Sequence, residues 1–421
     1  MSDTGQQPNY TSEAPALSAD GMVIAFVSSA DNLVLGDSPN DCTTISGEPI
    51  SCADIFVRDR AVNLTERISV VNGTPGFGES GVIDEWGAHV AVSADGHVLA
   101  FHSSADNLAP GCLEAGVGIF VVDRRTGAIE CAARGIGATA ANGRSVYPAL
   151  SAEGRYVVFI SEANNLVEGD TNGVSDIFVL DRRNQTLERV NVAGSGEQAN
   201  AASDMFFGSP AISADGRFVV FVSYADNLTP DDDNQQPDIF LRDRLNSETV
   251  LLSRSRTGKA PNGEVFAPVI SADGRFVAFH SDAANLVPGD TNGSSDVFVL
   301  EPATGTLERV SISSGGAEGN DRSTGPLLSG DGRWVAFSSL ADNLVPGDTN
   351  KNVDAFVHDR QTGMTYRVSV GANGVEGNGP SIASAMAENG CCIAIWSMAD
   401  NWIEGDTNGV WDIFLISMAR Q

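Results

Sequence analysis

A short turn motif that recurs seven times at a nearly constant spacing constrains this chain more than any other feature. Six copies read serine, a small residue, an acid and glycine, and the last copy is altered. They begin at Ser18, Ser93, Ser151, Ser213, Ser271, Ser329 and Ala387. The steps between copies are 75, 58, 62, 58, 58 and 58 residues. A fixed period of this size is typical of one supersecondary unit copied around an array.

One repeat contains four short strand patterns. In the copy that begins near Ala267 they cover residues 268–271, 275–279, 296–300 and 307–312, and they are rich in valine, isoleucine and phenylalanine. The first two are joined by a glycine turn, since glycine is free to take a positive φ. Short β-rich runs bounded by glycine, aspartate and proline indicate strands. No window of the chain shows a convincing apolar stripe of helical period.

Four strands in each of seven repeats predict an all-β fold, a seven-bladed β-propeller of four-stranded blades. The strands are apolar on both faces, as expected for a blade packed between two neighbours. A phenylalanine of the third strand recurs in every copy and is expected in the core between blades. These residues are Phe56, Phe120, Phe178, Phe240, Phe298, Phe356 and Phe414. Asp-Arg pairs follow most third strands at a hairpin, and we expect them to supply turn chemistry and exposed ion pairs of little energetic weight.

The repeat pattern "P-x-I-S-A-D-G-R-F-V-A-F … D-I-F-V-x-D-R-x-T-G-x-x-x-R-V" resembles the WD40-like PD40 repeats of the TolB-type β-propellers. The resemblance covers the chain from about Glu13 onward. That family includes periplasmic scaffold proteins, propeller domains of peptidases and some polysaccharide lyases. The resemblance implies the fold and is nearly silent on function, because one fold hosts many chemistries.

The two ends of the chain bear on how the ring closes. Residues 1–12 are expected to form an N-terminal extension and residues 13–421 a single propeller domain. The sequence stops at the third strand of the seventh repeat. Three explanations stay open: a three-stranded last blade, weak closure by residues 1–6, or a shortened chain.

The charge balance restricts the partners. The chain has 55 acidic and 25 basic residues, a net charge of −30. Nucleic-acid binding depends on lysine and arginine that neutralise phosphates, so we expect no nucleic-acid partner. The same charge argues against anionic membrane surfaces, and no apolar run is long enough for a spanning helix, so we expect no membrane insertion. Strong acidity favours solubility and cation binding.

Six cysteines bear on the cellular compartment. They form three candidate pairs, which are Cys42 with Cys52, Cys112 with Cys131, and Cys391 with Cys392. The first pair brackets an insertion of the first repeat and is the favoured disulfide, the second is a weaker pairing, and the third is either a vicinal disulfide or two thiols. Six cysteines allow fifteen connectivities, so these are preferences. Loop cysteines in an acidic, lysine-poor protein favour an extracytoplasmic location, secreted or periplasmic, although the sequence shows no signal peptide.

An acidic motif between the second and third strands is the main candidate site. It reads Asp-x-Asn-x-x-x-Asp in most repeats, and hard oxygen ligands around a glycine turn suit Ca²⁺. The predicted ligands are Asp170, Asn172, Asp176, Asp232, Asn234, Asp238, Asp290, Asn292, Asp296, Asp348, Asn350, Asp354, Asp406, Asn408 and Asp412. We therefore predict several structural calcium ions. The alternative is turn capping alone, since Asp and Asn also bond their own backbone amides.

The second repeat has lost this motif, and Cys112 and Gly118 stand where the acids would be. That blade is expected to use a disulfide in place of the ion. An asparagine upstream of the motif recurs in all repeats, at Asn32, Asn107, Asn165, Asn227, Asn285, Asn343 and Asn401. Because the repeat without the acids keeps it, we expect a buried amide that satisfies backbone groups.

Loops that depart from the repeat pattern are the candidates for binding a partner. In a propeller, the loops between second and third strands and the connections between blades emerge on one face, which we call the loop-rich face. Two deviant loops add aromatic and acidic residues, with Asp84 and Trp86 in one and Phe206 and Phe207 in the other. They suit a protein or glycan partner. Because no catalytic constellation is apparent, we expect a calcium-stabilised binding or scaffold module rather than an enzyme. The alternative is a carbohydrate-active enzyme, a polysaccharide lyase or hydrolase, that uses the same face.

Overall fold

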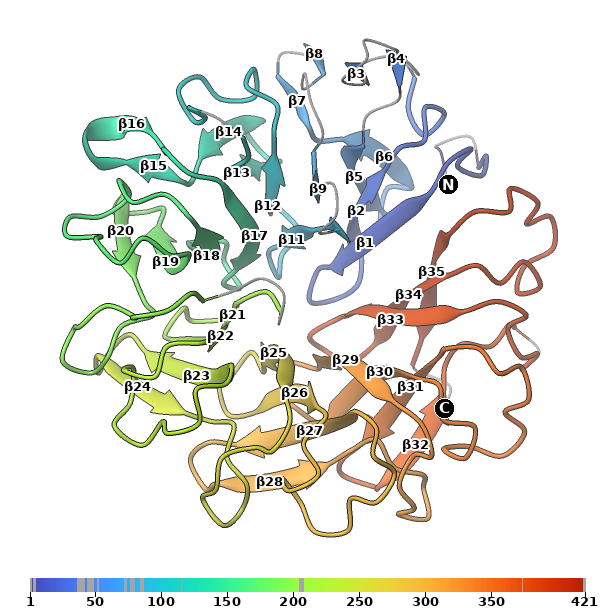
Figure 1. Ribbon diagram of the computed structural model, residues 1–421. Helices are drawn as coiled ribbons and strands as arrows, with labels where there is room; N and C mark the ends of the chain where they lie inside the picture. Colours follow the sequence, from blue (N-terminus) through green and yellow to red (C-terminus); the bar gives the residue numbers. More distant parts are fainter. Residues whose placement is uncertain are drawn as a thin grey trace.

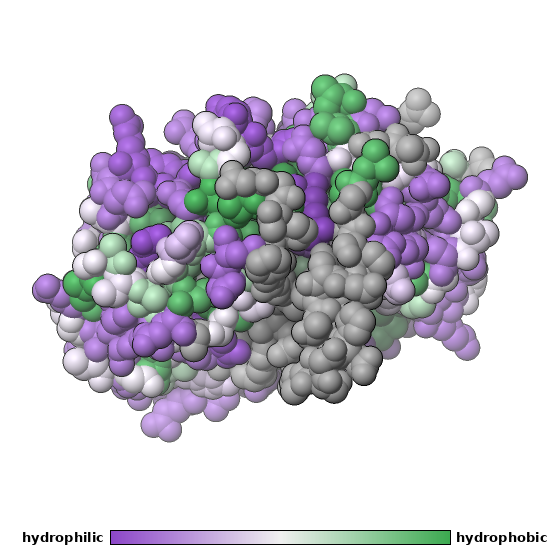
Figure 2. Space-filling model, turned by 90° about the horizontal axis from the view of Figure 1, so that it is seen from above, coloured by the Kyte–Doolittle hydropathy of each residue, from purple (hydrophilic) through white to green (hydrophobic). Residues whose placement is uncertain are grey.

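The computed structural model describes residues 2, 5–35, 42–43, 49–50, 53–71, 74–75, 80–83, 87–114, 116–203, 208–372 and 374–418. Seven antiparallel sheets surround a central axis like the blades of a wheel (Figure 1). This confirms the predicted seven-bladed propeller. Seen from the side, the surface is mostly hydrophilic, with small separate hydrophobic patches (Figure 2). No helix among the described residues is long and apolar enough to cross a membrane.

Six blades have four strands each, in simple sequence order from the centre outward. The first three are β1 (Ser12–Leu17), β2 (Val23–Ser28), β5 (Asp54–Asp59) and β6 (Leu64–Arg67); β11 (Val90–Val92), β12 (Val98–Ser103), β13 (Gly118–Asp123) and β14 (Ala128–Cys131); β17 (Ser145–Leu150), β18 (Tyr156–Ser161), β19 (Asp176–Asp181) and β20 (Thr186–Arg189). The next three are β21 (Ala211–Ile212), β22 (Phe218–Ser223), β23 (Asp238–Asp243) and β24 (Glu248–Leu251); β25 (Val265–Ile270), β26 (Val277–Ser281), β27 (Asp296–Glu301) and β28 (Thr306–Arg309); β29 (Ser323–Leu328), β30 (Trp334–Ser339), β31 (Asp354–Asp359) and β32 (Met364–Arg367).

The seventh blade has three strands, β33 (Ser381–Met386), β34 (Cys392–Ser397) and β35 (Asp412–Ser417). Additional strands of two residues each lie in a loop of blade 1 and in the connections between blades 1, 2 and 3. They are β3 (Cys42–Thr43), β4 (Pro49–Ile50), β7 (Val70–Val71), β8 (Thr74–Pro75), β9 (Val82–Ile83), β10 (Gly87–Ala88), β15 (Arg134–Gly135) and β16 (Thr139–Ala140).

The recurring turn has one architecture in blade after blade. In blade 5, Ser271 Oγ donates to Asp273 Oδ1 at 2.6 Å and accepts the amide of Phe276 at 3.0 Å. Gly274 adopts a φ of +72°, and a side chain there would meet the ring of Phe218 in the previous blade. The motif therefore needs glycine both for the turn and for the close approach of neighbouring blades.

The recurring phenylalanines fill the space between blades, as predicted. Six are fully buried, and each stacks on a second-strand phenylalanine of its own sheet, as Phe298 does on Phe279 with ring centroids 5.7 Å apart. Phe414 is only half-buried because β35 is the outer strand of its sheet. Burial of large aromatic rings is a main source of stability in such an array.

The aspartates after the third strands supply turn chemistry as predicted, since Asp359 Oδ1 accepts the amide of Gln361 at 3.0 Å, but the expected exposed ion pairs do not form between the Asp-Arg neighbours, all of which the structure describes. Asp359 is 2 % exposed, and Arg333 grips both of its oxygens, with Nε 2.9 Å from Oδ1 and Nη2 2.7 Å from Oδ2. The adjacent Arg360 instead donates to the carbonyl of Gly332 at 2.6 Å and pairs with Glu308 of the previous blade. Asp359 caps its own hairpin, and Arg360 joins blade 6 to blade 5. The two residues are adjacent in sequence but do not pair with each other.

The N-terminal segment docks between blades 7 and 1, where Figure 1 places the N-terminus. Gln7 Nε2 donates to Asp406 Oδ1 of blade 7 at 3.1 Å, and Asn408 Nδ2 donates to the carbonyl of Pro8 at 3.2 Å. The amide of Asn9 donates to Asn32 of blade 1 at 3.1 Å. Residues 7–9 thus bridge the first and last blades without adding a strand to either.

Candidate functional site: the acidic loops

The two kinds of loop on the loop-rich face touch each other. Thr291 lies in the loop between β26 and β27, and Glu318 lies in the connection from blade 5 to blade 6. The amide of Thr291 donates to Glu318 Oε1 at 3.0 Å, and its hydroxyl donates to Oε2 at 2.7 Å. Thr349 and Glu376 repeat these contacts in blade 6, at 2.8 and 2.7 Å. The two sets of loops therefore share one face and stabilise each other.

Three carboxylates gather around one arginine in blade 5. Asp290 comes from the loop, Asp296 is the first residue of β27, and Glu318 comes from the connection. One oxygen of each lies within 4.8 Å of the others. Arg309, at the end of β28, places Nη1 2.8 Å from Asp296 and 3.9 Å from Asp290, and it also pairs with Glu318. Three carboxylates and one guanidinium give the cluster a formal charge of −2.

Blade 6 builds the same cluster from the equivalent residues. Asp348, Asp354 and Glu376 bring their carboxylate oxygens within 4.8 Å of one another. Nη1 of Arg367 lies 3.3 Å from Asp348, 3.6 Å from Asp354 and 2.5 Å from Glu376. The connection glutamate was not among the residues that we predicted as ligands. Its signal in the sequence is the repeated Glu-Gly-Asn of the two connections, at residues 318–320 and 376–378.

Burial makes the two aspartates of each cluster costly to ionise, whereas burial of the glutamate is outweighed by hydrogen bonds from threonine and arginine, which lower its pKa. Burial, followed by repulsion from Asp296, raises the pKa of Asp290 to about 6. Burial and then the carboxylate of Asp354 raise the pKa of Asp348 to about 6 in the same way. The side chain of Asp290 is 4 % exposed, and its Oδ1 is buried without a hydrogen-bond partner. A second cation at such a site would satisfy oxygens that the protein leaves unpaired.

The loop asparagines act mainly as turn residues. Asn292 Nδ2 donates to the carbonyl of Gly319 at 2.9 Å, and its Oδ1 accepts the amide of Ser294 at 2.7 Å. Asn172, Asn350 and Asn408 make equivalent bonds, and Oδ1 of Asn234 accepts the amide of Gln236 at 2.9 Å. The amide oxygen that we predicted as a ligand is therefore held by the turn. The carboxylates are the groups left with unpaired capacity, and the asparagines stay predicted ligands.

Blade 3 carries one acid fewer than blades 5 and 6. Gln198 takes the place of the connection glutamate and donates to the hydroxyl of Thr171 at 2.7 Å. Arg189 lies 3.1 Å from Asp170 and 3.2 Å from Asp176, so the guanidinium balances half of the negative charge.

Blade 4 lacks the fourth-strand arginine that accompanies the loop aspartates in blades 3, 5 and 6. Leu251 stands opposite Phe240, at the strand position that carries arginine in blades 3, 5 and 6. Asp232 and Asp238 each keep one buried oxygen without a hydrogen-bond partner. Burial raises the pKa of Asp238 to about 6.

Blade 7 resembles blade 3 on its connection side, because Gln7 bonds Asp406 as described above. Asp412, the first residue of β35, accepts a hydrogen bond from Asn408 at 2.8 Å. Burial raises the pKa of Asp412. The five predicted loops are thus brought to one face but are not equivalent.

The recurring upstream asparagine ties each blade to the connection that precedes it. Asn343 Nδ2 donates to the carbonyl of Glu318 at 2.8 Å, and its Oδ1 accepts the amide of Asn320 at 3.0 Å. Five other copies repeat both bonds, at Asn32, Asn165, Asn227, Asn285 and Asn401. The expectation that this amide satisfies backbone groups is confirmed for these copies, but the expected burial is not, because four of the six are half-buried and Asn343 and Asn401 are exposed.

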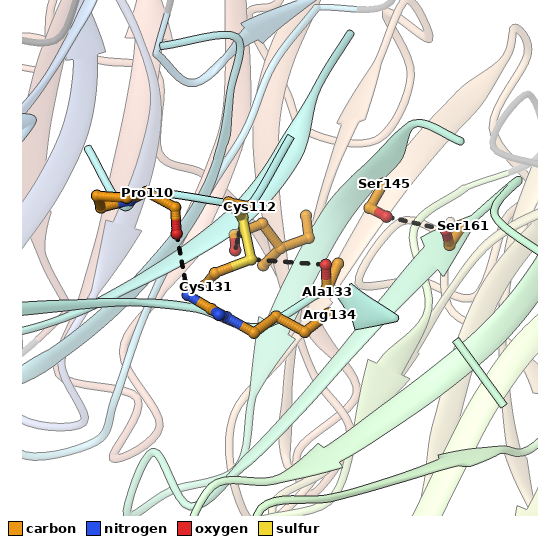
Figure 3. Close-up of a disulfide and its surroundings, with 8 residues drawn as sticks. Pro110, Cys112, Cys131, Ala133, Arg134, Ser145 and Ser161 are labelled. Atoms are coloured by element: carbon orange, nitrogen blue, oxygen red, sulfur yellow. Dashed lines mark hydrogen bonds between the residues drawn. A yellow bond between two sulfur atoms is a disulfide. The ribbon is translucent and has the colours of Figure 1, made fainter. Parts of the chain in front are cut away.

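The second blade contains the disulfide expected there. Cys112 and Cys131 are bonded, with Cα atoms 5.5 Å apart, and the bond joins the loop before β13 to the end of β14 (Figure 3). Arg134 beside it donates to the carbonyl of Pro110 at 3.2 Å. The same strands of blades 5 and 6 are joined by the acid–arginine cluster, so a covalent bond takes that role in blade 2.

The adjacent pair Cys391 and Cys392 is present as two thiols, with sulfur atoms 2.8 Å apart and Cys392 buried. Burial raises the pKa of Cys392 to about 12. Gly21 of blade 1 packs against this sulfur, and a side chain there would lie 2.1 Å from it. Of the two alternatives for this pair, two thiols are therefore found and not a vicinal disulfide. Cys52 lies outside the described residues, and only the backbone is described at Cys42.

The predicted aromatic loops cannot be placed. Asp84, Trp86, Phe206 and Phe207 all lie outside the described residues. The candidate ligand face therefore stays a prediction from the sequence.

Two histidines of blade 2, one just before β11 and the other in β12, lie together near the central channel. His89 and His102 both contact the ring of Tyr147, with centroids 5.5 and 5.8 Å apart. His89 lines a channel of about 630 Å³ and bonds the carbonyl of Pro148 at 2.9 Å. His102 is fully buried, and burial followed by His89 lowers its pKa to about 3. Both rings are neutral at physiological pH, so this cluster packs the channel wall.

Comparisons with known proteins support the fold. No protein-family model matches the chain, and no curated protein matches it at a significant level. Among solved structures, the β-propeller domain of the Trilobed protease from Pyrococcus furiosus, described as an open velcro topology, aligns with a TM-score of 0.55 and 9 % identity, covering 97 % of this chain and 93 % of that one. An oligogalacturonate lyase from Vibrio parahaemolyticus aligns with a TM-score of 0.52 and 12 % identity, covering 96 % and 89 %.

A TolB from Agrobacterium tumefaciens is also similar, with a TM-score of 0.41 and 16 % identity over 72 % of this chain and 83 % of that one. At these identities the likeness concerns the β-propeller fold. It leaves function to be argued from the site.

Proposed function

We propose that this protein is a calcium-stabilised, extracytoplasmic β-propeller that binds a protein or glycan partner through its loop-rich face. The observation that carries the proposal is the pair of three-carboxylate clusters in blades 5 and 6, each with a formal charge of −2. They lie at the junction between the loops and the connections that form this face. An ion there would fix the shape of the surface that meets the partner.

The residues of these clusters fit calcium in chemistry and charge. Ca²⁺ prefers carboxylate oxygens and tolerates irregular geometry. In blade 5 the ion would be held by Asp290, Asp296 and Glu318, and it would match the charge of −2 that remains after Arg309 is counted. The unpaired Oδ1 of Asp290 supplies a ligand that needs no other bond to break. The ion supplies charge neutralisation and cross-links the loop to the connection.

Binding is favoured over turnover by the state of the histidines. His102 is fully buried, and His89 is held by a backbone carbonyl. Neither offers a free base to a substrate on the loop-rich face. The disulfide between Cys112 and Cys131 supports an extracytoplasmic location, because such bonds persist in oxidising compartments.

Calorimetry on chelator-treated protein tests the calcium sites. We expect saturable heat of binding for Ca²⁺ and a higher Tm at saturation, since a ligand that binds only the native state stabilises it. The double variant Asp290→Asn, Asp348→Asn should lose both effects. Glu248→Gln, which removes an exposed carboxylate at the start of β24, is the matched control and should retain them. Equal calcium response in all three proteins would contradict the assignment.

The partner is tested separately, on a glycan array and by capture of candidate proteins, with calcium and with chelator. The proposal expects binding that is lost on chelation and in the double variant. Binding that ignores both treatments would place the partner on another surface.

A further inference from the structure

The outer edge of blade 7 is unlike the outer edge of any four-stranded blade. In blade 5, β27 pairs on one side with β26 and on the other with β28. In blade 7, β35 pairs with β34 alone among the described residues. All six residues of β35 are partly exposed, whereas five of the six in β27 are buried. An exposed edge strand presents backbone donors and acceptors in a row that another strand can pair with.

The fourth strands show what such a strand contributes. In blade 5 the amide of Val310 donates to the carbonyl of Val297 at 2.9 Å. Arg309, opposite Phe298, reaches Asp296, and Ser311 Oγ donates to Asp296 Oδ1 at 2.5 Å. Blade 6 repeats this with Arg367, Val368 and Ser369. An apolar residue two positions before the arginine is also common, as with Leu307.

Blade 7 keeps the loop and third-strand residues that accept bonds from the fourth strand in other blades. Phe414 and Asp412 occupy the positions of Phe298 and Asp296, and Asp406 occupies that of Asp290. Across the described part of the chain, no arginine or lysine forms an ion pair with Asp406 or Asp412. Two carboxylates, one of them with a burial-raised pKa, therefore face the edge where the other blades place a guanidinium.

An apolar groove runs beside this edge. It has a volume of about 290 Å³ and is lined chiefly by Ile24, Phe26, Ile403, Ile413, Phe414 and Leu415. Gln7, Pro8, Ser12 and Arg58 complete its rim, and Arg58 donates to Thr65 of its own blade at 3.0 Å. In blade 5 the equivalent space faces blade 6 and is filled by the side chain of Val310, which directly follows β28, is 1 % exposed and lies in one buried cluster with Phe337 of blade 6.

We propose that the edge of β35 binds, by strand addition, an extended segment of a partner protein with the pattern apolar–X–Arg–apolar–Ser. Backbone pairing with β35 would supply affinity, and the arginine and serine would reach Asp406 and Asp412 to supply specificity. A second copy of this chain is a poorer occupant. It carries the same net charge of −30, and its own exposed edge, Asp-Ile-Phe-Leu-Ile-Ser, brings no arginine.

A peptide taken from this chain is the sharpest probe. A labelled peptide with the sequence of residues 304–313 contains the fourth strand of blade 5, and its binding to the whole protein can be followed by fluorescence anisotropy. We expect saturable binding and protection of residues 412–417 from amide hydrogen exchange. Replacing its arginine by glutamate (R309E in the peptide) should raise Kd at least tenfold. Replacing its buried valine by proline (V310P) should abolish binding, because that residue donates a backbone bond in blade 5.

The peptide variants leave the protein unchanged, so a folding defect cannot imitate the result. Asp412→Asn in the protein should weaken binding of the arginine peptide and should not weaken binding of the glutamate peptide, because it removes an attraction in the first case and a repulsion in the second. Equal affinity of the arginine and glutamate peptides would overturn the proposal, as would binding without protection of β35. A dimer in sedimentation whose β35 stays protected in the presence of peptide would overturn it in favour of self-pairing. The measurements are made in chelator, because Asp406 and Asp412 are also among the predicted calcium ligands; a failure there counts against strand addition and leaves the calcium proposal for blades 5 and 6 untouched.

Discussion

The amide of Asn389 donates a hydrogen bond to the carbonyl of Ala19 at 3.1 Å, and this bond joins blade 7 to blade 1. It is the last link of a ring. The turn of each blade donates in the same way to the turn of the next, as Ala152 does to Ala214 at 3.0 Å. The face with the tight turns is therefore closed by bonds between backbone groups, while residues 7–9 close the loop-rich face through bonds that involve the side chains of Gln7, Asn32 and Asn408.

The side-chain closure makes Gln7 important for stability. Gln7→Ala removes the bond to Asp406 and leaves that carboxylate without its amide donor. We expect a loss of about 1 kcal/mol in the free energy of unfolding, measured by urea denaturation. Gln198→Ala removes the glutamine at the equivalent place between consecutive blades 3 and 4, where it donates to the hydroxyl of Thr171, and is the matched control. If closure depends on Gln7, its variant should also unfold faster than the control, and equal unfolding rates would argue against this role.

Arg309 should be needed most when calcium is absent. Arg309→Met leaves three buried carboxylates without a counter-charge, and we expect a loss of about 3 kcal/mol in chelator. Saturating calcium should restore part of this loss, because the ion can replace the guanidinium. Arg275→Met removes an exposed partner of Glu301 and should cost far less. Similar losses in the two variants would mean that the cluster of blade 5 contributes little.

The disulfide of blade 2 should contribute strongly. A double replacement, Cys112→Ser with Cys131→Ser, opens a cross-link over a sequence separation of 19. The chain-entropy model predicts a loss of about 3 kcal/mol in the free energy of unfolding. Cys391→Ser changes a thiol that has no disulfide and serves as the comparison. A loss no larger than that of Cys391→Ser would show that the acid-free blade does not rely on the bond.

Low pH should destabilise the protein by protonating the hairpin aspartates that pair with arginine. Hydrogen bonding from Arg333 lowers the pKa of Asp359 to about 2, and Arg155 does the same for Asp181. A carboxyl with a lowered folded pKa stabilises fully above its unfolded pKa of about 3.9, and this contribution is lost as the pH falls toward 2. Asp359→Asn should therefore lower Tm at pH 6, and the difference from the natural protein should shrink toward pH 2.5. A difference that stays constant over this range would rule out this ion pair as the cause.

Periodicity was enough to predict the fold, because each repeat carries its own turn, strands and buried phenylalanine. Ser271 and Gly274 make local bonds and a local turn, which a sequence motif reports directly. The same holds for Asn343, whose presence in every copy indicated a structural amide. The three-stranded last blade was one of three explanations that the sequence left open, and only the structure distinguishes it.

The charge networks were harder to predict because their partners are far apart in the chain. Glu318 joins Asp290 and Asp296 only after the connection folds back over the loop. Asp359 looked like a partner of Arg360, its neighbour, but backbone geometry sends Arg360 toward the previous blade and brings Arg333 in from the adjacent strand. Spacing cannot show which of several acids and bases become buried together.

The bonds made by Gln7, Pro8 and Asn9 copy those of residues 376–378 in the connection from blade 6 to blade 7. Threonine and asparagine of the acidic loop meet both segments in the same way, through Thr407 and Asn408 in one case and Thr349 and Asn350 in the other. In the folded propeller, residues 7–9 therefore act as one more connection between neighbouring blades. A circularly permuted chain that begins in another connection should fold into the same propeller.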